Sequence, residues 1–292
     1  MSRLSGSRVA VLEREHPRGH QGALLAPLVR ALRGRGAHVR VITVTGAAVR
    51  LDVAPEWDLA LLKSGDPVAL HQAAAAAAWG VQVMNGPDQT RLAQDRIAVA
   101  FILRRAGLPV PLVRAIHVPQ QATALESFRG WDRRARFVKS RRGSRGTGLW
   151  RVGPDHAPDG PGLTPSGAYL IMDEVPHEGD DLKVYVVDDW LAAIERRFPA
   201  TTLTEKRGRR VAVPEEAGQV AISAGRLLGL RLYGCDFVRG RTGWVLVDVN
   251  AFPGYKGIDD AAEHIAQALD EVPPVAGVAG DASRPAAAAG AA

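Results

Sequence analysis

Three oxygen-bearing side chains near the C-terminus, Asp236, Asp248 and Asn250, could bind a hard cation together. Asp236 lies in an apolar run, and twelve positions later Asp248 and Asn250 alternate with valine in a second run. The turn-rich residues 239–243 between them predict a β-hairpin. Two carboxylates and an amide oxygen suit Mg²⁺ or Mn²⁺, and Mg²⁺ is usually completed by substrate phosphates. The alternative is an exposed hairpin face with ordinary acidic residues.

The expected hairpin also predicts how these side chains face. Side chains alternate along a strand, so Asp248 and Asn250 point the same way. With the turn centred near residue 241, Asp236 is expected opposite about residue 246 and diagonal to Asp248. The three side chains then converge where a core strand would carry valine or isoleucine, which indicates a nucleotide enzyme.

Composition favours a soluble globular protein. The 292 residues are 46% hydrophobic and 23% charged, enough for one large domain or two to three small ones. The single cysteine, Cys235, excludes an intrachain disulfide and fits a reducing cytoplasm. The N-terminus has no signal-peptide core, and the small-apolar run at 73–79 is too short to span a bilayer. A cytoplasmic protein without membrane partners is expected.

The net charge of +6 raises the question of a nucleic-acid partner. Arginines are scattered, and no helix-turn-helix or zinc knuckle accompanies them, which argues against nucleic acid as the primary partner. Three basic clusters, at 133–134, 141–145 and 206–210, suit nucleotide phosphates or an anionic substrate instead.

The chain begins with alternating strand and helix patterns that predict a parallel α/β domain. Strands are expected at 8–12, 39–44, 58–62 and 81–85, and helices at 22–33 and 67–79. A helix from Asp88 to about Arg105 follows, and then short β-type runs begin at 112, 136, 149, 169, 182 and 191. Further helices are expected at 121–128, 215–228 and 259–271. Residues 153–167 read as a loop and 273–292 as a disordered tail.

A strand ending in Lys139 leads into a glycine-rich stretch with glycines at 143, 146 and 148. Such glycines let backbone N–H groups approach phosphate oxygens, and Lys139 would supply a point charge. A strand follows, so this is no Walker A loop. A flexible hairpin loop is the alternative.

Charged side chains also mark the following strands. Asp181 and Lys183 share a strand face, where a carboxylate could accept from ribose hydroxyls, and the alternative is a solvated edge strand. The neighbouring strand ends in Arg196 and Arg197, one of which should face the same cleft as Lys183. Two surface arginines are the alternative.

The order of these features resembles the ATP-grasp superfamily. The features are Lys139, the glycine loop, the 172–175 linker, Asp181 and the Asp236…Asp248-x-Asn250 set, and the resemblance covers about 85–272. Within the superfamily the chain looks closest to the ribosomal-protein glutamate ligase-like carboxylate–amine ligases, although 248–255 also resembles the inositol polyphosphate kinases.

The resemblance implies an ATP-grasp fold of α/β and α+β class, with a Rossmann-like pre-ATP-grasp domain in front. The expected boundaries are 1–86 for this N-terminal domain, 87–175 for the central lobe, 176–272 for the C-terminal lobe and 273–292 for the tail.

The resemblance also implies roles for individual residues. Lys139 would contact the ATP phosphates, and Asp181 would contact the ribose. Asp236, Asp248 and Asn250 would hold one or two Mg²⁺ ions. Arg96 stands where the family has a lysine, which changes the contact geometry. The remaining nucleotide contacts would be the loop residues Ser144, Arg145, Gly146, Thr147 and Gly148, with Glu174 and Val175 at the adenine.

The implied activity is an ADP-forming carboxylate–amine ligase that acts through an acyl phosphate. Some peptide-forming members carry an arginine for the tetrahedral intermediate at the position of Gly234. In this chain Arg196 or Arg197 would take over that role, with Lys183 beside them. An ATP-grasp kinase acting on a polyol or sugar-phosphate hydroxyl is the alternative, and a nucleotide-binding protein without catalysis is a third.

Substrate residues are expected outside the nucleotide set. Lys63 and Ser64 follow the third strand, and Lys256 follows the metal strand. The substrate would be a small molecule or a peptide, and a homo-oligomer is compatible with the sequence.

Overall fold

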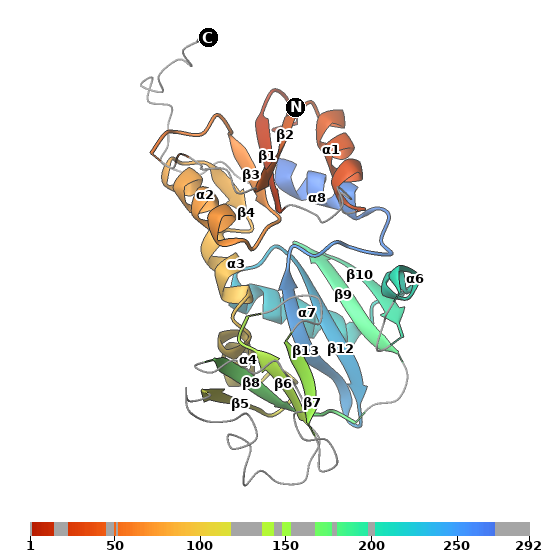
Figure 1. Cartoon of the computed structure of the whole chain (residues 1–292). Coiled ribbons are helices and arrows are strands. Elements are labelled where there is room, and N and C mark those ends of the chain that lie inside the picture. Colours follow the sequence, from red (N-terminus) through yellow and green to blue (C-terminus); the bar gives the residue numbers. More distant parts are fainter. Residues whose placement is uncertain are drawn as a thin grey trace. The chain divides into compact units, whose positions relative to one another are not determined.

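The computed structural model divides the chain into two compact units (Figure 1). One unit contains residues 1–87 and the residues from Ile265 onward, and the other contains residues 88–264. The described residues are 2–14, 23–44, 50, 52–117, 136–142, 148–152, 167–176, 180–197 and 202–271. No helix in these segments is long and apolar enough to cross a membrane.

Three expected features lie outside the described residues. These are the helix at 121–128, nearly all of the loop at 153–167, and the tail at 273–292.

The first unit is built on a parallel sheet with the order β2-β1-β3-β4. All four residues of β3 are buried, as expected for a parallel strand covered on both faces. The expected parallel α/β arrangement is therefore confirmed. The strands are β1 (Arg8–Arg14), β2 (His38–Val44), β3 (Leu59–Leu62) and β4 (Gln82–Met84), with helices α1 (Leu25–Gly34) and α2 (Pro67–Ala78).

Local sequence fixes where α2 begins. Asp66 is its N-cap and accepts a hydrogen bond from the Val68 amide at 2.8 Å, while Pro67 occupies the first turn. Small residues follow, and the buried Ala69, Leu70, Ala73 and Ala76 pack into the core of this unit with Leu12 and Leu62.

The second unit contains two antiparallel sheets. The smaller has the order β5-β8-β6-β7 and is formed by β5 (Val113–His117), β8 (Ala168–Asp173), β6 (Arg136–Ser140) and β7 (Leu149–Val152). The larger has the order β11-β10-β9-β12-β13 and is formed by β9 (Asp181–Val187), β10 (Trp190–Arg196), β11 (Arg209–Val211), β12 (Leu232–Gly240) and β13 (Gly243–Ala251). Figure 1 shows β9, β12 and β13 side by side.

One face of the larger sheet carries the main hydrophobic core. Leu182, Val184 and Val186 alternate on β9 and pack with the helices α4 (Arg96–Arg105) and α7 (Glu215–Leu228). Because strand side chains alternate, Lys183 and Tyr185 are left on the opposite face. The polar residues that could do chemistry therefore share the face that the core helices do not cover.

The expected helix from Asp88 to Arg105 is interrupted. The structure has α3 (Pro87–Ala93) and then α4, whose N-cap is Asp95. The Asp95 carboxylate accepts from the Ile97 and Ala98 amides at 3.2 Å, so it starts a new helix rather than continuing the first. The other helices in the described residues are α6 (Leu203–Arg207) and α8 (Ala261–Asp270).

Gly225 allows α7 to pack closely on β12. A Cβ at this position would lie 2.1 Å from the Tyr233 hydroxyl, which donates to the Ala221 carbonyl at 2.9 Å. Tyr233 is buried and has no room to move. We expect Gly225→Ala to lower the free energy of unfolding by about 1 kcal/mol or more, since overpacking costs about 1–3 kcal/mol and exceeds the gain in helix propensity.

Urea unfolding followed by circular dichroism measures this change, and α7 offers a matched control. A Cβ at Gly218 would lie 3.3 Å from the terminal methyl groups of Leu191 and Val213, which can yield. Gly218→Ala should therefore be neutral or stabilising. Equal effects of the two substitutions would contradict the packing argument.

Candidate functional site

The β12–β13 hairpin brings Asp236 and Asp248 directly opposite each other. The expected pairing of Asp236 with about residue 246 is wrong, because Leu246 pairs with Phe237. The register shifts between Asp236 and Phe237, where β13 has one extra residue, Val247. This is a β-bulge, in which two residues on one strand oppose one on the other.

The bulge decides which face carries the candidate ligands. Gly240 pairs with Gly243 at the turn, so an unbroken ladder would set Val247 opposite Asp236. Asp248 would then lie on the core face with Phe237, because a one-residue slip moves every later side chain to the other face. The extra residue returns Asp248 and Asn250 to the face of Asp236.

The three candidate metal ligands meet on that face. The Asn250 amide nitrogen donates to Asp236 Oδ2 at 3.2 Å and to Asp248 Oδ2 at 3.3 Å. The amide presents its nitrogen here, so Asn250 would have to turn its oxygen inward to complete, with the two carboxylates, an oxygen set that fits Mg²⁺ or Mn²⁺. Among the described residues, no group of three or more His, Cys, Asp or Glu side chains could hold a metal, and this candidate set contains two carboxylates and one amide.

Two cationic side chains contact Asp236 from the neighbouring strands. Lys183 Nζ lies 2.6 Å and Arg196 3.0 Å from Asp236 Oδ1. Burial would raise the pKa of the Asp236 carboxyl, but Lys183 and Arg196 outweigh it and hold this pKa below its usual range. Arg197, the next residue, is exposed after the end of β10, so Arg196 is the arginine that faces Lys183.

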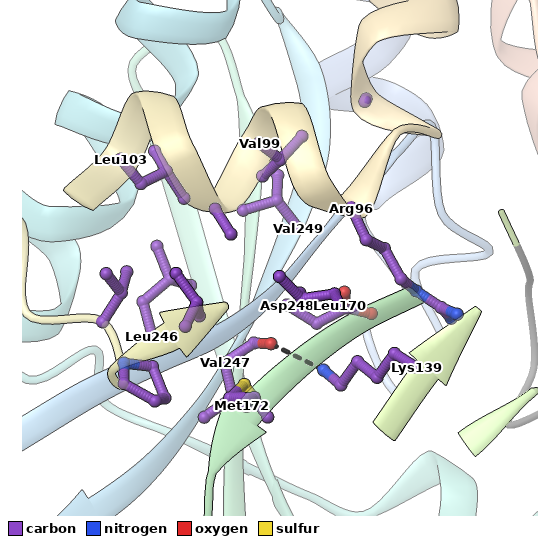
Figure 2. Close-up of a pocket in the computed structure, with 15 residues that line it drawn as sticks. Arg96, Val99, Leu103, Lys139, Leu170, Met172, Leu246, Val247, Asp248 and Val249 are labelled. Carbon is purple, nitrogen blue, oxygen red and sulfur yellow. Dashed lines mark hydrogen bonds between the residues drawn. The ribbon is translucent and has the colours of Figure 1, made fainter. Parts of the chain in front are cut away.

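A pocket adjoins this cluster, between α4, β8 and β13 (Figure 2). Arg96, Lys139 and Asp248 lie at one end, and Leu103 and Leu246 lie toward the other. Most other lining side chains are apolar, among them Val99, Val110, Leu170, Met172 and Val249. Charged groups at one end and apolar side chains at the other would suit a ligand that has both an anionic and an apolar part.

Lys139 is anchored by the bulge. Its ammonium donates to the Val247 carbonyl at 2.9 Å, the contact drawn in Figure 2. Burial lowers the pKa of Lys139, and nearby Asp248 opposes this shift while Arg96 adds to it. Arg96 is placed by its own contact, since it donates to the Ser140 carbonyl at 3.1 Å.

The glycine loop is described only at its end. Ser144, Arg145, Gly146 and Thr147 lie outside the described residues. Gly148 has φ +66°, and its carbonyl accepts from the Ser140 amide at 2.8 Å. A Cβ at Gly148 would lie 2.0 Å from the Ser140 hydroxyl oxygen, so this position requires glycine.

The expected adenine and ribose residues lie at the adjacent strand ends. Glu174 follows β8, and its carboxylate is bound to Arg151 at 2.9–3.1 Å. Val175 is half-buried next to it. Asp181 is buried at the start of β9, opposite Arg196 in the strand register.

The expected substrate residues are separated along the chain. Lys63 and Ser64 belong to the first unit, where the buried Lys63 ammonium lies 3.1 Å from Glu13 Oε2. Lys256 is exposed in the segment after β13. Sequence reasoning missed Glu13, which lies next to the last residue of β1, opposite Thr43 of β2, and has no motif to mark it.

Sequence reasoning also missed the bulge, although the apolar pattern carries a signal. Trp244 and Leu246 contribute to the core from even positions, whereas Val249 and Ala251 contribute from odd positions. A change from even to odd within one strand requires an extra residue between 246 and 249.

Comparisons with known proteins show which chains and folds this protein is similar to. The RimK-like ATP-grasp domain family matches residues 169–271. A ribosomal protein bS6--L-glutamate ligase from Escherichia coli O139:H28 is 27% identical over 219 residues, which cover 70% of this chain and 72% of the relative. A probable alpha-L-glutamate ligase from Xanthomonas euvesicatoria pv. vesicatoria is 26% identical over 283 residues, covering 89% and 92%.

Solved structures show the same fold. An ATP-grasp RimK domain protein from Sphaerobacter thermophilus has a TM-score of 0.67 at 22% identity, covering 90% of this chain and 99% of that one. D-cycloserine synthetase DcsG has a TM-score of 0.68 at 18% identity, with the same coverage. The chain therefore has the ATP-grasp fold, and its residues 169–271 match the RimK-like ATP-grasp domain family.

Proposed function

We propose that this enzyme is a Mg²⁺-dependent carboxylate–amine ligase that forms an acyl phosphate and releases ADP and phosphate. The observation that carries the proposal is the row of Lys183, Asp236 and Asp248 across three neighbouring strands, beside the pocket that holds Lys139. This row combines cation ligands with cationic side chains, as phosphoryl transfer requires. The names of the ligase relatives support the same chemistry.

Each charged group has a proposed part in binding ATP. Asp236, Asp248 and Asn250 would hold Mg²⁺, which supplies charge neutralisation at the β- and γ-phosphates. Lys139 and Arg96, at one end of the pocket, would bind phosphate oxygens.

The adenine and ribose contacts complete the proposed nucleotide site. Because the Glu174 carboxylate is bound to Arg151, we assign adenine recognition to backbone groups near Glu174 and Val175. Asp181 would accept from the ribose, and the loop 144–148 would cover the phosphates.

Lys183 and Arg196 would act at the reacting centre. A substrate carboxylate oxygen forms a bond to the γ-phosphorus as the bond to ADP breaks. An amine nitrogen then bonds to the acyl carbon, loses a proton, and inorganic phosphate leaves. Both cations would neutralise negative charge that develops in these two steps. Arg197 would contribute only by turning from its exposed position.

The relatives suggest the substrates. Two are named as glutamate ligases, and the structurally similar ligase PsnB was solved with a precursor peptide. We therefore propose L-glutamate as the amine and a peptide carboxylate as its acceptor, with Lys63, Ser64 and Lys256 as candidate substrate contacts. We place the enzyme in the cytoplasm, where ATP is available and the buried Cys235 thiol stays reduced.

Phosphorus NMR with Mg-ATP, L-glutamate and a peptide pool tests the reaction. ADP and inorganic phosphate that appear only when both co-substrates are present would support the ligase. A new phosphomonoester resonance without free phosphate would replace it with the hydroxyl kinase. ATP consumption that is independent of any amine would contradict the amine-transfer step.

A further inference from the structure

The two carboxylates of the candidate metal site are outnumbered by cations. Lys183 and Arg196 both contact Asp236, at 2.6 and 3.0 Å. Lys139 and Arg96 line the same pocket as Asp248. Without a nucleotide, a divalent cation approaching this site would meet a net positive field.

Lys183 is the most firmly placed of the cations at Asp236. Its side chain is 8% exposed, compared with 22% for Arg196. It sits directly opposite Asp236 in the strand register and reaches it by passing over Gly234. A Cβ at Gly234 would lie 3.3 Å from Lys183 Cε and 3.3 Å from the Tyr185 ring, so only glycine leaves this path fully open.

The hydrogen bonds of the site also oppose a bare cation. Lys183 occupies Asp236 Oδ1, and Asn250 directs its amide nitrogen at the other oxygen of Asp236 and at Asp248. A cation held by all three side chains would need the Asn250 amide oxygen and a share of Asp236. It would therefore bind the free oxygen of Asp236 right beside the buried Lys183 ammonium, which holds the other oxygen and repels the cation. Nucleotide phosphates would reverse the positive electrostatic field at the site, and Lys183 could then form an ion pair with a phosphate oxygen.

We propose that Lys183 also keeps a free divalent cation out of the Asp236–Asp248–Asn250 site, so that the cation enters only together with nucleotide phosphates. This inference rests on the metal site of the proposed function. It adds an order of binding to that function, and it assigns the order to one side chain.

Electron paramagnetic resonance of Mn²⁺ tests the inference on the full-length protein. The free-Mn²⁺ signal reports binding without turnover, once the Mn²⁺ bound by the analogue alone has been subtracted. Wild type should bind Mn²⁺ at least about tenfold more weakly alone than with a non-hydrolysable ATP analogue. Lys183→Met should bind Mn²⁺ alone about tenfold more tightly than wild type does. Lys183→Arg, which keeps the charge, should restore the exclusion.

Arg105→Met is the matched control. Arg105 is an exposed cation on α4, so its loss removes the same charge away from the site and should leave Mn²⁺ affinity within twofold of wild type. Lys183→Gln is a second neutral variant in case the methionine variant does not fold.

Two outcomes overturn the inference. Wild type could bind Mn²⁺ equally well with and without the analogue, or both neutral variants could bind Mn²⁺ alone no more tightly than wild type. Failure of the proposed function looks different: turnover would be absent with every carboxylate and amine, while the difference between Lys183→Met and wild type in Mn²⁺ binding would persist.

Discussion

Asp248→Asn should reduce ATP turnover about 100-fold or more while leaving the fold intact. The substitution keeps the shape of the side chain and an oxygen for the Asn250 amide, which donates to Asp248 at 3.3 Å. It removes one of two negative charges that would hold the cation, and losing a single electrostatic group at a reacting centre costs about 10²–10³ in rate. Coupled ADP release under the conditions that support wild-type turnover measures the loss.

Asp259→Asn is the control for charge alone, because Asp259 is exposed between β13 and α8. It should keep the wild-type rate, and both variants should show wild-type circular dichroism and unfolding temperatures. If Asp248→Asn retained more than a fifth of the wild-type rate, Asp248 would not be a cation ligand in catalysis.

Lys139→Met should weaken binding of a non-hydrolysable ATP analogue by about 10- to 100-fold, which corresponds to about 1.4–2.8 kcal/mol. The ammonium is buried at the charged end of the pocket, where phosphate oxygens would replace the Val247 carbonyl as its partner. Methionine has similar length and volume but no charge. Isothermal titration calorimetry with the analogue and Mg²⁺ gives the change, and Arg105→Met should bind like wild type.

The same variant should be no less stable than wild type, and the difference should depend on pH. Burial lowers the pKa of Lys139 in the folded protein, so between this pKa and the ordinary value of 10.5 the unfolded chain binds more protons. Wild type therefore gains stability relative to Lys139→Met as the pH rises through this window. Urea unfolding of both proteins at several pH values checks the sign, and a wild type that loses stability relative to Lys139→Met as the pH rises would contradict the burial argument.

The fold was predictable because its signals are local. Short apolar strands alternating with capped helices predicted the parallel sheet, and the runs around Asp236 and Asp248 predicted the hairpin. The break between α3 and α4 was missed because one side chain, Asp95, favours a new cap over the continuing helix. Helix propensity averaged over many residues does not show that a single side chain ends one helix and begins the next.

The site was predictable in its residue types and less so in its geometry. Asp236, Asp248 and Asn250 were selected by chemistry, and alternation placed the last two on one face. The pairing of Asp236 was wrong because register depends on turn length and on the bulge at Val247 together. The Lys139 anchor could not be predicted, since its partner is a backbone carbonyl that carries no sequence signature.

The bulge at Val247 also constrains how this hairpin can change length during evolution. The two-residue turn between Gly240 and Gly243 and the extra residue at Val247 together determine which residues of β13 lie on the face of Asp236. Gain or loss of one residue at the turn would place Asp248 on the core face of the sheet, unless the bulge were lost or gained at the same time. We therefore expect related chains with a different turn length to differ also in whether β13 has this bulge.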